Sequence, residues 1–149
     1  MADKGSFMPA PELGRSFRPG LGVNLLMRDV AEGVRFARDV LGATILHADQ
    51  DFAAIRFGDS VWMLHQDKTY RGNAVLGLVQ DMEGRGAGIE LRLYGCSPDA
   101  AEARARAGGW TVLAGSSDKP HGLRECVILD HEGYAWVPGT GIADKGVTT

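Results

Sequence analysis

A segment near the middle of the chain places a carboxylate, a guanidinium and a phenol at alternate positions. Glu90, Arg92 and Tyr94 are the polar residues of GIELRLY. Side chains of a β-strand alternate between faces, so Ile89 and the two leucines should face helices while the polar three share the other face. On that face Arg92 could bind a carboxylate or phosphate of a ligand through two hydrogen bonds. Glu90 could orient the Arg92 guanidinium, accept a hydrogen bond from a ligand hydroxyl or act as a base. The alternative is a solvent-facing ion pair.

Three histidines could join Glu90 in a metal or ligand site: His47, His65 and His121. No pair among these residues has the local spacing of common metal motifs. A lone histidine is more often a surface or hydrogen-bonded group. These residues therefore form an alternative metal set rather than the expected one.

The loop KPHGLRE carries further candidates. His121 could close over a ligand or remain exposed. Arg124 and Glu125 point to opposite faces of one predicted strand, so at most one of them lines a common cavity. Other catalytic motifs are missing from the sequence: it has no P-loop, HExxH or G-x-S-x-G, and GRGAG at 84–88 leads into a strand rather than a helix.

The composition indicates one ordinary globular domain. The chain has 149 residues and a formal net charge of −3, which gives no general attraction to nucleic acid or anionic membranes. No apolar run approaches the roughly 20 residues of a membrane-spanning helix, and the first residues lack the apolar stretch of a secretory signal. Two cysteines without metal-like spacing suggest free thiols. We expect a cytoplasmic protein without nucleic-acid or membrane partners.

An internal repeat organises the chain. LGVNLLM alternates like a strand, Asp29 can cap a helix over 30–41, and three strand-like segments follow up to residue 66. The second half repeats this order from residue 88 to 138, with an offset of 67 between Gly42 and Gly109 (109 minus 42). Each half therefore reads as strand, helix and three strands.

The boundaries of the predicted domain follow from this repeat. Residues 1–19 form an N-terminal arm, 20–138 the domain, 67–87 the linker between its two modules, and 139–149 a flexible tail. Neither half can bury both faces of its sheet alone. We expect a homodimer, because curved sheets with short edge strands need covering.

The folded region resembles the vicinal oxygen chelate superfamily, which includes glyoxalase I, extradiol dioxygenases, fosfomycin-resistance enzymes and bleomycin-resistance proteins. The matching pieces are NLLMRDVAEGVRFARDVLGA, DAAEARARAGGWTVL and KPHGLRECVILDHEGYAWVP. One departure is Ala37, where the family usually has tyrosine. The resemblance implies an α+β fold of two paired βαβββ modules, whose curved mixed sheets enclose a cavity.

The resemblance also implies four metal-ligand positions, which fall on Gly22, Met63, Glu90 and Val137. Glycine and valine offer no donor to a hard cation, and a methionine thioether suits only soft metals. One ligand in four remains, whereas catalysis by a divalent metal needs about three protein ligands. We therefore expect no metal and no other cofactor.

Together these patterns predict a metal-free protein that binds a small, partly polar organic molecule. The alternatives are a divalent-metal-dependent lyase, isomerase or dioxygenase of the same superfamily, and an accessory domain with an empty cavity. The best candidate for a catalytic role, if there is one, is Glu90. The predicted ligand-binding residues are Asn24, Met63, His65, Glu90, Arg92, Tyr94, His121 and Arg124.

Overall fold

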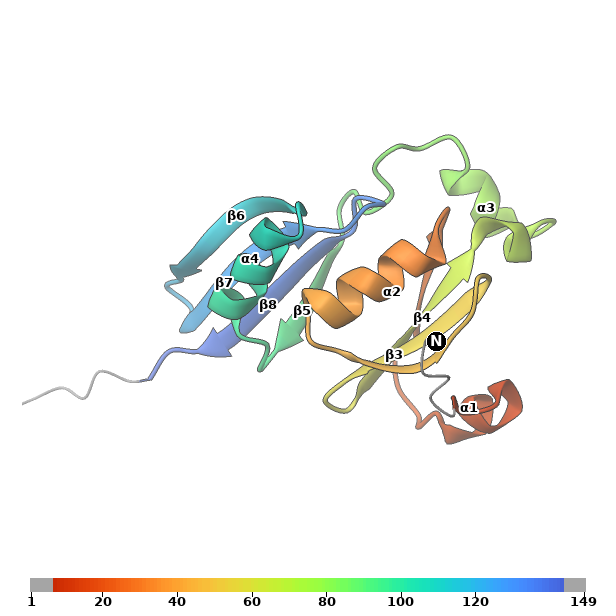
Figure 1. Cartoon of the computed structure of the whole chain (residues 1–149), viewed down its shortest axis with the longest axis horizontal. Coiled ribbons are helices and arrows are strands. Elements are labelled where there is room, and N and C mark those ends of the chain that lie inside the picture. The colour runs from red at the N-terminus through yellow and green to blue at the C-terminus, as the bar shows by residue number, and fades with distance from the viewer. Residues whose placement is uncertain (1–6, 144–149) are drawn as a thin grey trace, which may run out of the picture. The chain divides into compact units, whose positions relative to one another are not determined.

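The computed structural model describes residues 7–143 and divides into two compact units (Figure 1). The first unit ends at Met82 and the second begins at Glu83. Each unit is built around one four-stranded sheet. The division falls inside the predicted linker.

The first unit contains one sheet with the order β1-β4-β3-β2. Strands β1 and β4 are parallel and the other pairs are antiparallel. Its elements are α1 (Ala10–Ser16), β1 (Val23–Met27), α2 (Val30–Asp39), β2 (Thr44–Ala48), β3 (Phe52–Phe57), β4 (Ser60–Gln66), η1 (Asp67–Tyr70) and α3 (Ala74–Val79).

The second unit has a sheet of the same kind, with the order β5-β8-β7-β6. Its strands β5 and β8 are parallel, as β1 and β4 are in the first unit. Its elements are β5 (Glu90–Tyr94), α4 (Pro98–Ala107), β6 (Thr111–Asp118), β7 (Leu123–Leu129) and β8 (Ala135–Gly141). The predicted α+β class and the two βαβββ modules are confirmed. Both sheets are open, since each has two edge strands among the described residues.

The two principal helices have local caps, and α2 begins where the sequence predicted but ends at Asp39 rather than at 41. Asp29 caps α2 by accepting a hydrogen bond from the Glu32 backbone N–H at 3.2 Å, and Ser97 caps α4 in the same way. Gly42 and Gly109 follow the helices with φ of 70° and 77°, a conformation that favours glycine. Residues at the helix ends therefore determine where α2 and α4 begin and end.

Segments outside the two predicted modules also contain structure. The arm includes α1, whose Leu13 is buried, and the linker includes η1 and α3. The predicted tail begins with residues 139–141, which complete β8, and its last six residues lie outside the described part of the chain. Ile89 precedes β5 and is 52% exposed, so its predicted packing against a helix was wrong.

The edge strands β2 and β6 carry matching irregularities. The register of β2 shifts between Ile45 and His47, and that of β6 shifts between Val112 and Ala114 and again between Ala114 and Ser117. The shift in β2 and the first shift in β6 lie 67 residues apart (112 minus 45), so both strands have an extra residue at this equivalent position. In β2 this residue is Leu46, whose carbonyl accepts a hydrogen bond from the Met8 backbone N–H at 3.2 Å.

A tight turn between β7 and β8 anchors the start of the second unit. Oδ1 of Asp130 accepts hydrogen bonds from the backbone of Glu132 and Tyr134, and its Oδ2 accepts one from the Trp136 indole at 3.0 Å. Arg85 reaches this turn: its backbone N–H donates to the Glu132 carbonyl at 2.9 Å, and its Nε lies 3.5 Å from Oε2 of Glu132. Both side chains of this ion pair are buried.

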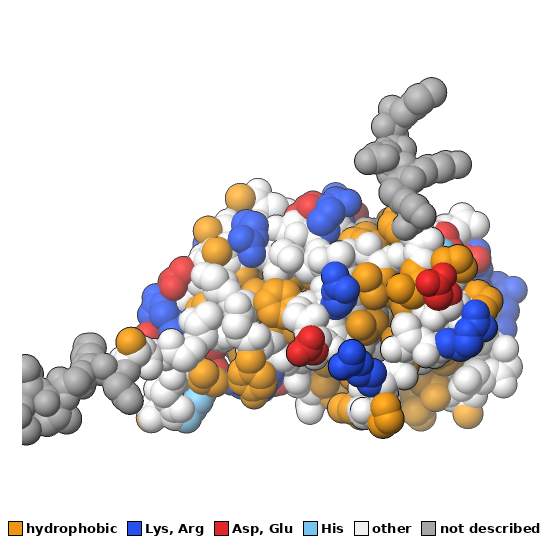
Figure 2. Space-filling view, turned by 90° about the horizontal axis from the view of Figure 1, so that it is seen from below, with side chains coloured by type: hydrophobic (Ala, Val, Ile, Leu, Met, Phe, Trp, Pro, Cys, Tyr) orange, Lys and Arg blue, Asp and Glu red, His pale blue; other side chains and the backbone are white. Residues whose placement is uncertain are grey.

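Charges of both signs and apolar side chains are interspersed on the face drawn in Figure 2. That face therefore presents no large basic patch within the described part of the chain. Among residues 7–143, no helix has the length and apolar character needed to cross a membrane.

A carboxylate ties α4 to β6 and makes stability depend on pH. Oε2 of Glu102 accepts a hydrogen bond from the Ser116 backbone N–H at 2.7 Å, and Oε1 lies 2.9 Å from Nη2 of Arg106. These contacts, the Ser116 bond foremost, lower the pKa of Glu102 to about 2. A carboxyl with a lowered folded pKa contributes stability above its unfolded value, and that contribution is lost as the pH falls toward the folded value.

We therefore expect the free energy of unfolding to decrease between pH about 4.5 and about 2, in part through Glu102. Urea denaturation across this window should show a smaller pH dependence for Glu102→Gln than for the parent protein. The exposed Glu83 provides a control, because Glu83→Gln should leave the pH dependence unchanged. An identical profile for Glu102→Gln and the parent would contradict this role.

Candidate functional site

Helix α4 covers one face of the second sheet and leaves the other face for the candidate site. The thiol of Cys126 donates to the Pro98 carbonyl of α4 at 3.5 Å, and Ile128 and Trp136 are buried on the same side. Glu90 and Arg92 alternate with the leucines of β5 and therefore lie on the opposite face.

Four side chains from β5, β7 and the preceding loop form a charge cluster: Glu90, Arg92, His121 and Glu125. Nη1 of Arg92 donates to Oε2 of Glu90 at 2.8 Å, and Nη2 donates to Oε2 of Glu125. His121 places Nε2 at 3.3 Å from the same Glu125 oxygen. The predicted pairing of Glu90 with Arg92 is present, and a second carboxylate joins it.

Burial differs between the two carboxylates of the charge cluster. The side chain of Glu125 is 10% exposed, whereas that of Glu90 is 57% exposed. Desolvation lowers the pKa of Arg92, but the hydrogen bonds that its guanidinium donates to Glu90, Tyr94 and Glu125, together with the negative charge of Glu125, outweigh desolvation and raise the pKa overall. Arg92 is therefore a permanent cation held between two acceptors.

Arg124 does not join the charge cluster, although the sequence made it a candidate. Its guanidinium contacts Asp99 of α4 through two hydrogen bonds of 2.8 Å and Asp118 through one of 3.0 Å. These bonds raise the pKa of Arg124. Its neighbour Glu125 takes the place on the open face. Strand alternation predicted that at most one of Arg124 and Glu125 lies on the open face. It did not reveal that Asp99 of α4 would bind Arg124 on the other face.

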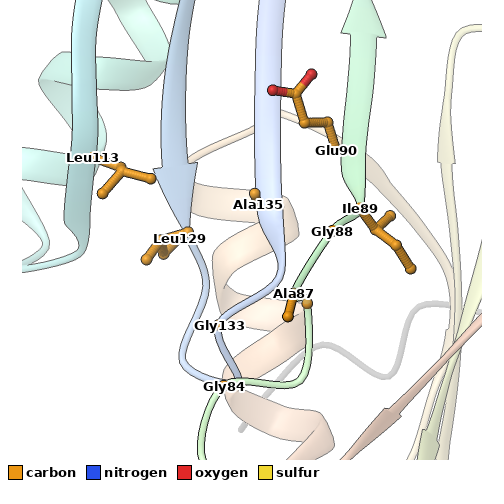
Figure 3. Close-up of a pocket in the computed structure, with 10 residues that line it drawn as sticks. Gly84, Ala87, Gly88, Ile89, Glu90, Leu113, Leu129, Gly133 and Ala135 are labelled. Atoms are coloured by element: carbon orange, nitrogen blue, oxygen red, sulfur yellow. The ribbon is translucent and has the colours of Figure 1, made fainter.

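An open pocket of about 740 Å³ lies beside Glu90. In Figure 3, Leu113 and Leu129 lie on one side of it, and Ile89 and Glu90 on the other. Glu90 is the charged residue among those that line it, which are Gly84, Gly86, Ala87, Gly88, Ile89, Glu90, Leu113, Leu129, Gly133 and Ala135. The volume is in the range of small-molecule sites, roughly 300–1,000 Å³.

In the first unit, Asn24, Met63 and His65 share the face of the sheet that points away from α2. Asn24 pairs with Met63 across β1 and β4, on the opposite parity to Leu64, which packs near Gly33 of α2. Asn24 donates to the Tyr70 hydroxyl at 3.2 Å. The face predicted for these three residues is therefore correct.

Aromatic rings form a row on this face. His47, Phe52, His65 and Tyr70 follow one another with centroid separations of 5.5, 5.0 and 5.2 Å. Burial lowers the pKa of His65 and favours its neutral form. The sequence did not single out Phe52 or Tyr70: the register between β3 and β4 brings Phe52 beside His65, and the turn of η1 after β4 brings Tyr70 there.

The side chains at the implied metal-ligand positions do not fit a hard cation. Gly22 offers no side chain, and Val137 is aliphatic and 2% exposed. Met63 has only a thioether, so Glu90 is the one hard donor among the four positions, and one of its oxygens already accepts a hydrogen bond from Arg92. Within residues 7–143, no group of three or more His, Cys, Asp or Glu side chains is arranged to hold a metal ion.

The alternative histidine set has other contacts. His47 pairs with Asp49 at 2.9 Å, His65 belongs to the ring row, and His121 pairs with Glu125. Two of these histidines lie in the first unit and one in the second. Each histidine therefore has a local role.

The sequence matches no protein-family model and no curated protein. Solved structures, however, match most of its length. A glyoxalase/bleomycin resistance protein/dioxygenase from Nocardioides is 21% identical, with a TM-score of 0.64 over 86% of this chain and 87% of that one. A family enzyme of the same description from Burkholderia phytofirmans is 20% identical, with a TM-score of 0.65 over 81% and 97%.

The chain has the glyoxalase/bleomycin-resistance fold. A glyoxalase-related enzyme from Fulvimarina pelagi supports the same conclusion, with 14% identity and a TM-score of 0.66 over 84% of this chain and 89% of that one. Identities this low establish the glyoxalase/bleomycin-resistance fold alone. The function must therefore be argued from the side chains of this chain.

Proposed function

We propose that this protein is a member of the glyoxalase/bleomycin-resistance superfamily that binds a small, partly polar organic molecule without a metal ion. The observation that carries the proposal is the charge cluster beside an apolar pocket on the open face of the second sheet. Apolar walls provide contact area, and a few placed polar groups orient a ligand. The donor chemistry of Gly22, Met63 and Val137 argues against a metal at the implied positions.

The proposal includes a cytoplasmic homodimer. Each sheet has exposed edges, which oligomerisation commonly covers. Sedimentation velocity at micromolar concentration tests the dimer independently of ligand binding, and a monomer would exclude this part of the proposal.

The binding proposal predicts stabilisation of chelator-treated protein by a small organic molecule. In a thermal-shift screen, a ligand at about 100 times its Kd adds about 2.7 kcal/mol to the stability of the folded state. For such a ligand, calorimetry should show an affinity about tenfold lower for Glu90→Gln, because a charged hydrogen bond contributes about 1.5–3 kcal/mol. Glu83→Gln should bind like the parent, because Glu83 is exposed and outside the pocket.

Added divalent ions separate this proposal from the metal-dependent alternative. The proposal expects the same affinity with and without them. Binding that appears only with a stoichiometric divalent ion would reject the metal-free function and favour a lyase, isomerase or dioxygenase that uses Glu90.

A further inference from the structure

The charge cluster has an excess of negative charge that bears on the class of ligand. It contains two carboxylates and one guanidinium, and the imidazole of His121 adds a positive charge only when protonated. Arg92 commits one terminal nitrogen to each carboxylate. An incoming anion would share the guanidinium with both carboxylates and would be repelled by their negative charge.

Glu90 is the group that remains available. One of its oxygens, Oε2, accepts from Arg92, and no partner for Oε1 is found within residues 7–143. Its side chain is more than half exposed and borders the pocket, where it is the charged lining residue. A carboxylate accepts hydrogen bonds and attracts cations.

The side chains that line the pocket indicate the chemistry of the part of the ligand that does not contact Glu90. Ile89, Leu113, Leu129 and Ala135 contribute aliphatic side chains to the lining, with Leu113 and Leu129 across the pocket from Glu90 (Figure 3). A molecule that fills this space needs an apolar body and one polar end. The polar end must satisfy an acceptor rather than a donor.

From this charge balance we infer that the ligand is an organic amine, with an apolar body in the pocket and an ammonium group donating to Glu90. In this arrangement Glu90 is the specificity-determining residue. Arg92 is a positioning residue, which holds the Glu90 carboxylate at the edge of the pocket. This inference rests on the proposed binding function and assigns the ligand class of that site.

Three probes with one ring and different charges test the ligand class. Tryptamine is a cation, indole-3-acetamide is neutral and indole-3-acetate is an anion, and each is titrated into the full chain by NMR. We expect tryptamine to bind about tenfold more tightly than the amide, and the acetate to bind most weakly. The preference should weaken with added salt, because the contact is partly exposed.

Variants locate the preference at Glu90. Glu90→Gln should bring tryptamine and the amide to equal affinity, whereas Arg124→Met should keep the parent order because Arg124 lies on the opposite face. Chemical-shift dispersion in the free proteins verifies that each variant is folded. A tryptamine preference that survives Glu90→Gln would overturn the inference.

The outcomes distinguish this inference from the proposed function. Tighter binding of the acetate, lost in Arg92→Met, would overturn the amine class and leave the binding function intact. Failure of all three probes to bind at millimolar concentration would also overturn the amine class. The function itself would fall only if the broader ligand screen found no metal-independent binder.

Discussion

Replacement of Gly86 by alanine is expected to lower the free energy of unfolding by about 3 kcal/mol, near the upper end of overpacking effects. A Cβ at this position would lie 2.5 Å from the Gly133 carbonyl oxygen and 2.6 Å from Cα of Tyr134. Both atoms belong to the backbone of a turn that Asp130 holds with three hydrogen bonds. They cannot move aside as the end of a side chain can.

Gly84 provides a matched control for this substitution. It lies two residues earlier in the same segment, and a Cβ there would meet nothing within 4 Å. Urea denaturation followed by circular dichroism should show a large loss of stability for Gly86→Ala and little change for Gly84→Ala. Equal stabilities of the two variants would show that the segment does not pack against the turn.

Arg85→Met is expected to cost about 3–5 kcal/mol, the range for removing one partner of a buried ion pair. The side chains of Arg85 and Glu132 are 0% and 1% exposed, so the remaining carboxylate would be buried without this guanidinium, although His131 lies 3.4 Å from its Oε1. Arg35→Met is the control. Its partner Glu32 lies 2.6 Å away on the surface of α2, where such a pair contributes about 0–1 kcal/mol.

A double variant distinguishes the loss of an ion pair from the loss of packing. Arg85→Met with Glu132→Leu removes both charges and should be more stable than Arg85→Met alone, since apolar replacements of buried pairs are often tolerated. The single variants Arg85→Met and Glu132→Leu complete the comparison. If the stability losses of these two single variants added up to the loss of the double variant, the two side chains would not be coupled, and the packing of each would explain its cost.

The sequence predicted those parts of the fold that depend on neighbours in the chain. The cap at Asp29 and the glycines after each helix are local signals, and the repeat with its offset of 67 gave both modules. Strand alternation then placed Glu90 and Arg92 on the correct face. Local signals and the repeat were enough to predict the βαβββ order, and the sequence named three of the four residues of the charge cluster, Glu90, Arg92 and His121.

The remaining features depend on contacts between distant segments. Glu125 replaces Arg124 in the charge cluster because Asp99 lies on the other side of the sheet, which the spacing of β7 alone does not reveal. The ring row needs the register between β3 and β4. The GRGAG segment gave no functional motif, and its packing role appears only when Gly86 meets the turn at Gly133.

The matching irregularities of β2 and β6 bear on how the protein behaves at high concentration. Each interrupts the regular succession of backbone donors and acceptors on an edge strand. In β2 the carbonyl of the extra residue is already bonded to the arm through Met8. A strand from another molecule would find no continuous template there, and natural sheets use such interruptions to resist edge-to-edge polymerisation. The extra residue at the equivalent position of each half therefore protects one edge of each sheet against fibrous aggregation.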